Sequence, residues 1–219
     1  MRLFNGIPWP DYDPDPDAQT DIPLLKVSAM SDMDYLDHDN ALPIWQTQAD
    51  LIIDRNIKTI VDAGCRHGPI LKILRDRNWI TPDFRYMGFD TSPEPIELAE
   101  LAWADYHNIE FRVADWDNLS DIVVPWDVDC VIWSATLLYA GSRHREVFNK
   151  VTRRLYDADY AIIQEPTKSQ RPEHIIPGQI LKTIEPEIST YSDMCEVMQT
   201  EVIECDIFCG SRMICLCSM

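Results

Sequence analysis

The sequence predicts an α/β fold: a doubly wound, mostly parallel seven-stranded sheet with a C-terminal antiparallel hairpin and helices on both faces. Three observations predict this architecture. Short apolar runs alternate with segments of helical periodicity, as in parallel βαβ units. Several runs end in an acid or a glycine turn, where ligands of open α/β sheets bind. The last two apolar runs are separated only by Cys209, Gly210 and Ser211, which is typical of a hairpin.

The elements follow from residue 41 onward. A first helix is expected over 41–55, because its apolar residues recur every three or four positions. Strands are expected at 58–63, 85–90, 109–113, 128–133, 159–164, 201–208 and 212–217. Helices are expected at 68–78, 93–106 and 142–155, with Ser92 as an N-cap and a short further helix within 175–184.

Charge restricts the partners of this chain. Its 219 residues carry a formal net charge of −18, and residues 1–40 alone hold nine Asp. An acidic surface repels phosphates, which disfavours a nucleic acid partner, whereas a neutral or cationic small molecule or a basic protein is compatible with it. Solubility alone would explain the charge equally well. The oligomeric state is left open.

The cysteines and the N-terminus indicate the compartment. The first ten residues lack the apolar core of a signal peptide, and no run reaches the roughly 18 apolar residues of a membrane helix. Seven cysteines favour reduced thiols, so we expect a cytoplasmic protein without membrane contact. Cys205, Cys209, Cys215 and Cys217 raise the question of zinc, but they form no CxxC pair, and no metal site is expected.

The most informative segment is KTIVDAGCRHG, residues 58–68. Its apolar run ends at Asp62, and Gly64 and Gly68 allow a tight turn and close approach of a ligand to the backbone. A helical pattern follows at once, so N–H groups at its start point toward the ligand. The next strand ends in Asp90, an acid in position to accept hydrogen bonds from both hydroxyls of a ribose.

At these residues the chain resembles the class I S-adenosylmethionine-dependent methyltransferases. Their first motif, D/E-x-G-x-G-x-G, stands here as DAGCRHG, with Arg66 in place of the middle glycine. The second motif matches Asp90, the third matches 114–116, and the fourth matches 127–140. The resemblance covers residues 40–219 and is carried by the order of these four strand ends.

The resemblance implies S-adenosylmethionine as cofactor and methyl transfer to a small-molecule or protein acceptor. It implies that Asp62 orients the turn and approaches the sulfonium, and that Arg66 binds the methionine carboxylate. Asp90 would bind the ribose, Asp115 the adenine amino group, and Trp116 would cover the ring. The full cofactor set is Asp62, Gly64, Cys65, Arg66, Gly68, Asp90, Thr91, Ser92, Asp115, Trp116, Trp133 and Ser134.

Candidate residues for the acceptor side lie at or just after later strand ends. Displacement at a sulfonium needs mainly alignment, and a base only where the acceptor must lose a proton early. The catalytic candidates are Glu165, His144 and Tyr139, with His174 as a further possibility. The fourth strand runs into WSATLLY instead of the Asn-Pro-Pro-Tyr motif of enzymes that methylate base amino groups in nucleic acid.

The organisation follows from these assignments. Residues 1–30 form an acidic Pro/Asp-rich N-terminal arm, irregular over 1–25, and residues 31–219 form a single methyltransferase-like domain. Within it, 58–135 is the cofactor half, while 31–57 and 136–200 supply the acceptor side. Two alternatives stay open. Arg66 in the glycine loop favours a non-catalytic S-adenosylmethionine-binding module, and the acid about 20 residues after the turn also occurs in nicotinamide-dependent oxidoreductases.

Overall fold

One seven-stranded sheet organises the protein. The computed structural model describes residues 3–4, 7–8, 42–116, 124–137, 140, 143–166, 195–204 and 211–219. The strands of the sheet are β3 Thr59–Ala63, β4 Arg85–Asp90, β5 Ile109–Val113, β6 Cys130–Ser134, β7 Tyr160–Pro166, β8 Glu196–Glu204 and β9 Ser211–Ser218. β-Branched and aromatic residues favour strands, because they pack well on a pleated surface. The expected strands at 85–90 and 109–113 agree residue for residue with β4 and β5.

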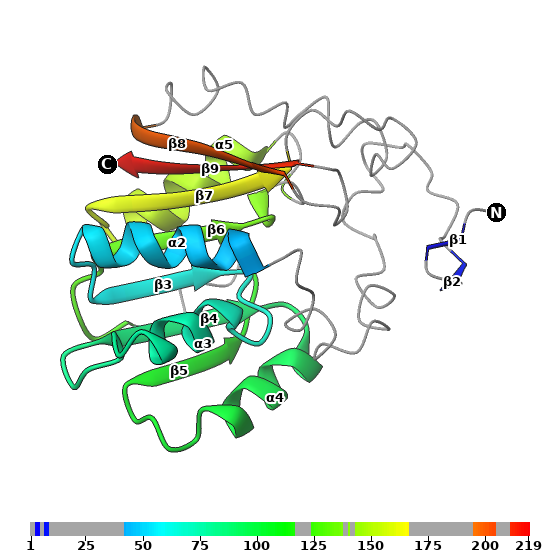
Figure 1. Cartoon of the computed structure of the whole chain (residues 1–219), viewed down its shortest axis with the longest axis vertical. Helices are drawn as coiled ribbons and strands as arrows, with labels where there is room; N and C mark the ends of the chain where they lie inside the picture. The colour runs from blue at the N-terminus through cyan, green and yellow to red at the C-terminus, as the bar shows by residue number, and fades with distance from the viewer. Residues whose placement is uncertain are drawn as a thin grey trace.

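The strand order is β5-β4-β3-β6-β7-β9-β8 (Figure 1). Strands β3 to β7 run parallel, and β9 joins β7 antiparallel, with β8 as its antiparallel outer neighbour. The predicted fold class is therefore confirmed. The chain order reverses between β3 and β6, and ligands of open α/β sheets bind in the crevice at such a switch point.

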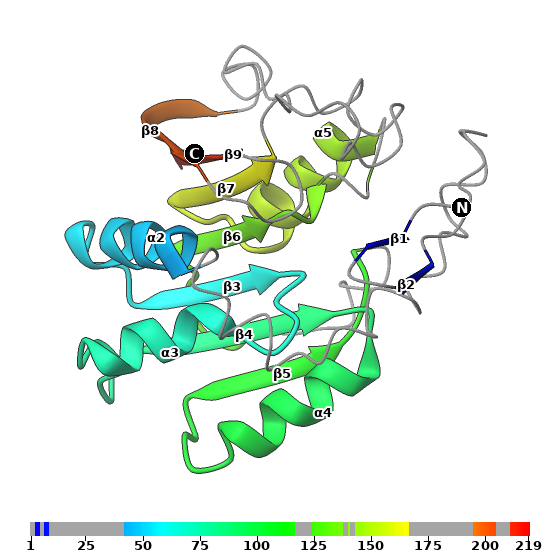
Figure 2. The ribbon, with the colours of Figure 1, turned by 45° about the vertical axis from the view of Figure 1, so that its right-hand side comes forward.

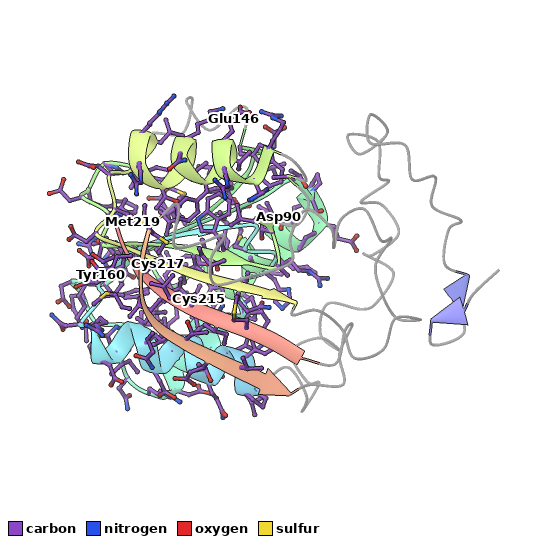
Figure 3. The ribbon with its side chains drawn as sticks, turned by 90° about the horizontal axis from the view of Figure 1, so that it is seen from above. Asp90, Glu146, Tyr160, Cys215, Cys217 and Met219 are labelled. Atoms are coloured by element: carbon purple, nitrogen blue, oxygen red, sulfur yellow. The ribbon has the colours of Figure 1, made fainter. Side chains whose placement is uncertain are left out.

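Helices cover both faces of the sheet. One face carries α2 Leu42–Asp54, α3 Pro69–Asp76 and α4 Pro93–Ala102, and the other carries α5 His144–Phe148 with the π-helix η5 Asn149–Leu155. Figure 3 separates the two layers, with α2 on one side of the strands and α5, marked by Glu146, on the other. The expected helix over 142–155 thus widens into a π-helix, and that over 93–106 ends earlier, at Ala102. The one expected within 175–184 lies outside the described residues.

Two apolar cores follow from this layering. On the α2 face, Ile52, Leu71 and Ile96 pack with Ile60 and Ile132 of the sheet. On the α5 face the core is formed by side chains of the alternate strand positions and the helices behind them, namely Val61, Val131, Trp133, Phe148, Val151 and Ile163. Because successive residues of a strand point to opposite faces, neighbouring strand residues belong to different cores.

The C-terminal hairpin begins earlier than the sequence predicted. We expected its first strand over 201–208, whereas β8 starts at Glu196 and residues 205–210 lie outside the described part. A bulge between Val197 and Gln199 breaks the two-residue alternation, which hides the start of the strand. In the arm expected to be irregular, β1 Leu3–Phe4 and β2 Ile7–Pro8 form a short antiparallel pair.

Candidate functional site

The glycine corner between β3 and α3 is tied to β4 by its own N–H groups. The N–H groups of Gly64 and Cys65 both donate to the carbonyl of Phe89, at 2.8 and 3.0 Å. The N–H of Arg66 donates to Asp90 Oδ2 at 3.0 Å. Phe89 and Asp90 thus accept these three N–H groups of the loop, and the expected role of Asp62 in orienting the turn stays a prediction.

Arg66 takes the backbone conformation that a glycine would normally supply. Its φ is 51°, between Gly64 at 81° and Gly68 at 70°. For an L-residue with a Cβ this left-handed conformation costs roughly 1–2 kcal/mol. Arg66 therefore preserves the backbone shape of the motif at the cost of strain.

Replacing Arg66 separates its backbone role from its charge. Arg66→Gly should raise the free energy of unfolding by up to about 1 kcal/mol, because the relieved strain exceeds the added entropy of the unfolded chain. Arg66→Ala keeps a Cβ at φ 51° and should bring no such gain. Urea unfolding of both variants measures the difference. A less stable Arg66→Gly variant would contradict the assignment of strain.

Asp62 lies buried beneath this corner. Only 4% of Asp62 is exposed, and Tyr86, on β4, donates its hydroxyl to Oδ2 at 2.7 Å. Oδ1 has no hydrogen-bond partner among the described residues. Burial raises the pKa of Asp62 to about 7, the hydrogen bond from Tyr86 counteracts that rise, and the charge of Asp90 adds to it. Burial also raises the pKa of the Cys65 thiol, whose sulfur lies in the core.

Asp90 ends β4 at the carboxyl edge of the sheet (Figure 3). Its Oδ2 accepts the N–H of Arg66, and its Oδ1 accepts the N–H of Ser92 at 2.9 Å. Because a carboxylate offers about four lone-pair sites, both oxygens can accept further hydrogen bonds. Thr91 is exposed and Ser92 is the N-cap of α4, without a side-chain cap bond.

The remaining cofactor candidates divide between the two faces of the sheet. Asp115 and Trp116 follow β5 and are half-buried, and the Trp116 carbonyl accepts from Lys150 Nζ at 2.6 Å. Trp133 is fully buried in the α5-side core, where its Nε1 donates to Thr152 at 3.1 Å. Its ring thus packs away from the α2 face, which carries Asp62 and Ser134. The assignments of Asp115 and Trp116 stay predictions.

Sequence reasoning missed three polar residues near this edge. Tyr86 contacts Asp62, and Gln48 and Gln164 flank Ser134. Gln48 lies on the buried face of α2 and donates Nε2 to Ser134 Oγ at 2.8 Å. The signal for Gln48 was a polar residue at a core position of the helical pattern.

The acceptor-side candidates are only partly described. His144 opens α5 and is half-buried, and Glu165 is the penultimate residue of β7. Tyr139 and His174 lie outside the described residues. The roles of the catalytic candidates therefore stay predictions.

The described residues contain no group of three or more His, Cys, Asp or Glu side chains that could hold a metal ion. Cys215 and Cys217 are buried on β9, and Cys205 and Cys209 lie outside the described part. Among the helices that are described, none is long and apolar enough to cross a membrane.

The residues at this edge fit S-adenosylmethionine. The unpartnered Oδ1 of Asp62 suits the positive charge of the cofactor, and Asp90 has lone pairs left for ribose hydroxyls. The backbone at Gly64 lies close to the Thr136 side chain, because a Cβ added to Gly64 would lie 2.7 Å from Thr136 Cγ2. The corner thus packs so closely against Thr136 that a larger residue would not fit at this position.

Solved structures share this fold. An N-methyltransferase, NodS from Bradyrhizobium japonicum WM9, in complex with S-adenosyl-L-homocysteine, superposes with a TM-score of 0.62 at 12% identity, over 84% of this chain and 90% of that one. The methyltransferase domain of bacterial CtHen1 gives 0.58 at 15% identity, over 80% and 97% of the two chains. The 16S rRNA methylase ArmA gives 0.57 at 15% identity, over 85% and 89%.

The sequence profile of a family described as "Methyltransferase domain" matches residues 53–195. That match begins at the end of α2, contains the glycine corner and Asp90, and ends just before β8. Together with the fold and the strand-end acids, it identifies the chain as a member of this methyltransferase domain family, whose cofactor is S-adenosylmethionine.

Proposed function

We propose that this protein transfers a methyl group from S-adenosylmethionine to a small-molecule or protein acceptor, at the crevice between β3 and β6. The observation that carries the proposal is the pair of carboxyl groups at the ends of adjacent strands, with Asp62 under the Gly64 turn and Asp90 beside it. Family membership supports methyl transfer itself. It leaves the nicotinamide-dependent alternative without support.

The residues of the chain hold and align the reactants in this proposal. The bound cofactor supplies a methyl group on a sulfonium, which needs alignment more than acid or base catalysis. Asp90 accepts hydrogen bonds from the ribose hydroxyls, and ionised Asp62 faces the ammonium group on the methionine part of the cofactor. His144 and Glu165 are the candidates for taking a proton from the acceptor, where one must leave.

The proposed class of acceptor rests on charge. The chain carries a net charge of −18, which opposes binding to a polyanion. The fold does not decide this point, because the 16S rRNA methylase ArmA shares it. The negative net charge of this chain therefore supports a neutral or cationic acceptor.

Asp90→Ala should weaken binding of S-adenosylhomocysteine at least tenfold, because ribose hydroxyls lose a charge-assisted partner and the Arg66 N–H loses its acceptor. Calorimetric titration measures this effect. Asp105→Ala is the control: Asp105 is exposed after α4, at the opposite end of the sheet. Equal affinities for the two variants would contradict the role of Asp90.

Radiolabelled methyl transfer tests the class of acceptor. The protein is incubated with S-adenosylmethionine labelled in its methyl group and a cell extract, which is then separated into small molecules, protein and nucleic acid. The proposal predicts label in the small-molecule or protein fraction, absent with Asp90→Ala. Label confined to nucleic acid would contradict it. Cofactor binding without transfer to any fraction would favour the alternative of a non-catalytic S-adenosylmethionine-binding module.

A further inference from the structure

Three polar residues meet between α2 and the carboxyl ends of β6 and β7. Gln48, Ser134 and Gln164 form what we term the amide cluster. Ser134 and Gln164 are register partners on neighbouring parallel strands, so their side chains lie on the same face of the sheet. Gln48 reaches them from α2, with its Nε2 at 2.8 Å from Ser134 Oγ.

The cluster is buried and incompletely hydrogen-bonded. Gln48 is 0% exposed and Gln164 is 2% exposed. Among the described residues, Gln48 Oε1 and Gln164 Nε2 have no hydrogen-bond partner. Turning the Gln48 amide over would exchange its two atoms and still leave one of them without a partner. Unpaired buried amide atoms cost free energy, and apolar side chains of the same length would avoid that cost.

The position of the cluster relates it to the crevice. Ser134 is the last residue of β6, and β6 borders the switch point next to β3. Ala135 follows at φ 53°, and its N–H donates to the carbonyl of Gln164 at 2.7 Å. This strained turn fixes the ends of β6 and β7 against each other, so Ser134 and Gln164 keep their spacing. Figures 1 and 2 place the start of α2 at the same edge of the sheet as these strand ends.

We propose that the amide cluster binds an uncharged group of the methyl acceptor that both donates and accepts hydrogen bonds, namely a hydroxyl or a carboxamide. The proposal rests on the function proposed above. A ligand that donates a hydrogen bond to Gln48 Oε1 and accepts one from Gln164 Nε2 would satisfy both unpaired amide atoms. The three side chains carry no charge, so an ionised group bound there would lose its hydration without an opposite charge to replace it.

Stability of the ligand-free protein separates this role from a structural one. Gln164→Met keeps the length of the side chain and removes its polar atoms. If the amide awaits a ligand, Tm of the variant should equal or exceed that of the wild type. If Gln164 instead pairs with Gln48 or with a permanently bound water, Tm should fall by several degrees, which would overturn the proposal.

Binding of matched probes tests the chemical class directly. Benzamide and benzyl alcohol carry the two predicted groups on a small apolar body, and benzoate is the charged counterpart of benzamide. Ligand-observed NMR titrations are made with and without S-adenosylhomocysteine. At least one neutral probe should bind the wild type at least tenfold more tightly than benzoate, and tenfold more weakly to Gln48→Met and Gln164→Met. Gln199→Met, on the exposed face of β8, should bind like the wild type.

The outcomes distinguish the two proposals. Equal binding of benzoate, unchanged binding by both cluster variants, or no binding of either neutral probe would overturn the role of the amide cluster. In each case intact affinity for S-adenosylhomocysteine would leave the proposed function standing. A wild type that binds no S-adenosylhomocysteine would contradict the proposed function, while the titrations made without it still test the cluster.

Discussion

Gly64→Ala should lower the free energy of unfolding by roughly 2–5 kcal/mol and abolish cofactor binding. Gly64 has φ +81°, and an added Cβ would lie 2.7 Å from Thr136 Cγ2 and closer still to its Oγ1. Strain at positive φ accounts for about 1–2 kcal/mol, and overpacking against Thr136 for about 1–3 kcal/mol. Urea unfolding and titration with S-adenosylhomocysteine measure the two effects.

A double variant separates the two causes. Adding Thr136→Ala removes Oγ1 and Cγ2 and leaves Cβ, which would lie 3.1 Å from the new methyl group. Gly64→Ala with Thr136→Ala should therefore recover the overpacking part and retain the strain at φ +81°. If Gly64→Ala alone left stability and affinity unchanged, the glycine corner would not be the rigid, close-packed element described above.

Asp62→Asn should make the ligand-free protein more stable at alkaline pH and weaken cofactor binding there. The pKa of Asp62 is raised to about 7 by burial, against a value of 3.8 for an unperturbed Asp. The native state thus binds a proton that the unfolded chain has already lost between those values. Wild-type stability falls as pH rises through this window, and Asp62→Asn removes the fall.

The size of the stability difference follows from the pH range between the two pKa values of Asp62. Each pH unit between the two pKa values costs about 1.4 kcal/mol, so the advantage of Asp62→Asn should grow by about 3 kcal/mol from pH 5 to pH 7. Affinity of the wild type for S-adenosylhomocysteine should rise over the same range, because ionised Asp62 attracts the ammonium group. Asp62→Asn should show neither change. Urea unfolding measures the stability and calorimetry measures the affinity, each at about pH 5, 6, 7 and 8.

Tyr86→Phe is the control for the comparison of the wild type with Asp62→Asn. It removes the hydroxyl that donates to Asp62 Oδ2 and leaves the carboxyl buried. Because that hydrogen bond lowers the pKa of Asp62, its loss should move the window to higher pH. If the free energy of unfolding changed with pH in the same way for the wild type and Asp62→Asn, Asp62 would be ionised throughout. That result would contradict the raised pKa of Asp62.

The sequence predicts the parallel strands and the strand-end acids well, because buried parallel strands read as apolar runs and the acids follow them directly. Asp90 is an example: its place after RYMGF sets its position at the edge of the sheet. Arg66 shows the same for the backbone, since it stands at the middle glycine position of the motif and takes a glycine-like φ of 51°. The early start of β8 was missed because its bulge breaks the alternation.

Contacts between distant side chains were not predictable in this way. The Tyr86 hydroxyl meets Asp62 only once β4 lies beside β3, and Gln48 meets Ser134 across 86 positions of sequence. The sequence predicted Trp133 as part of the cofactor site, because it stands near the end of a strand. Since successive strand residues point to opposite faces, its ring packs into the α5-side core. Local patterns give the strand ends, whereas pairing across the sheet decides which side chains meet.

Calorimetric titration of the wild type with S-adenosylhomocysteine at about pH 8, above the pKa of Asp62, tests the central claim most directly. The account predicts one site per chain with a Kd near micromolar, about −8 kcal/mol. Absence of binding under these conditions, in a protein shown to be folded, would contradict the cofactor site at Gly64 and Asp90.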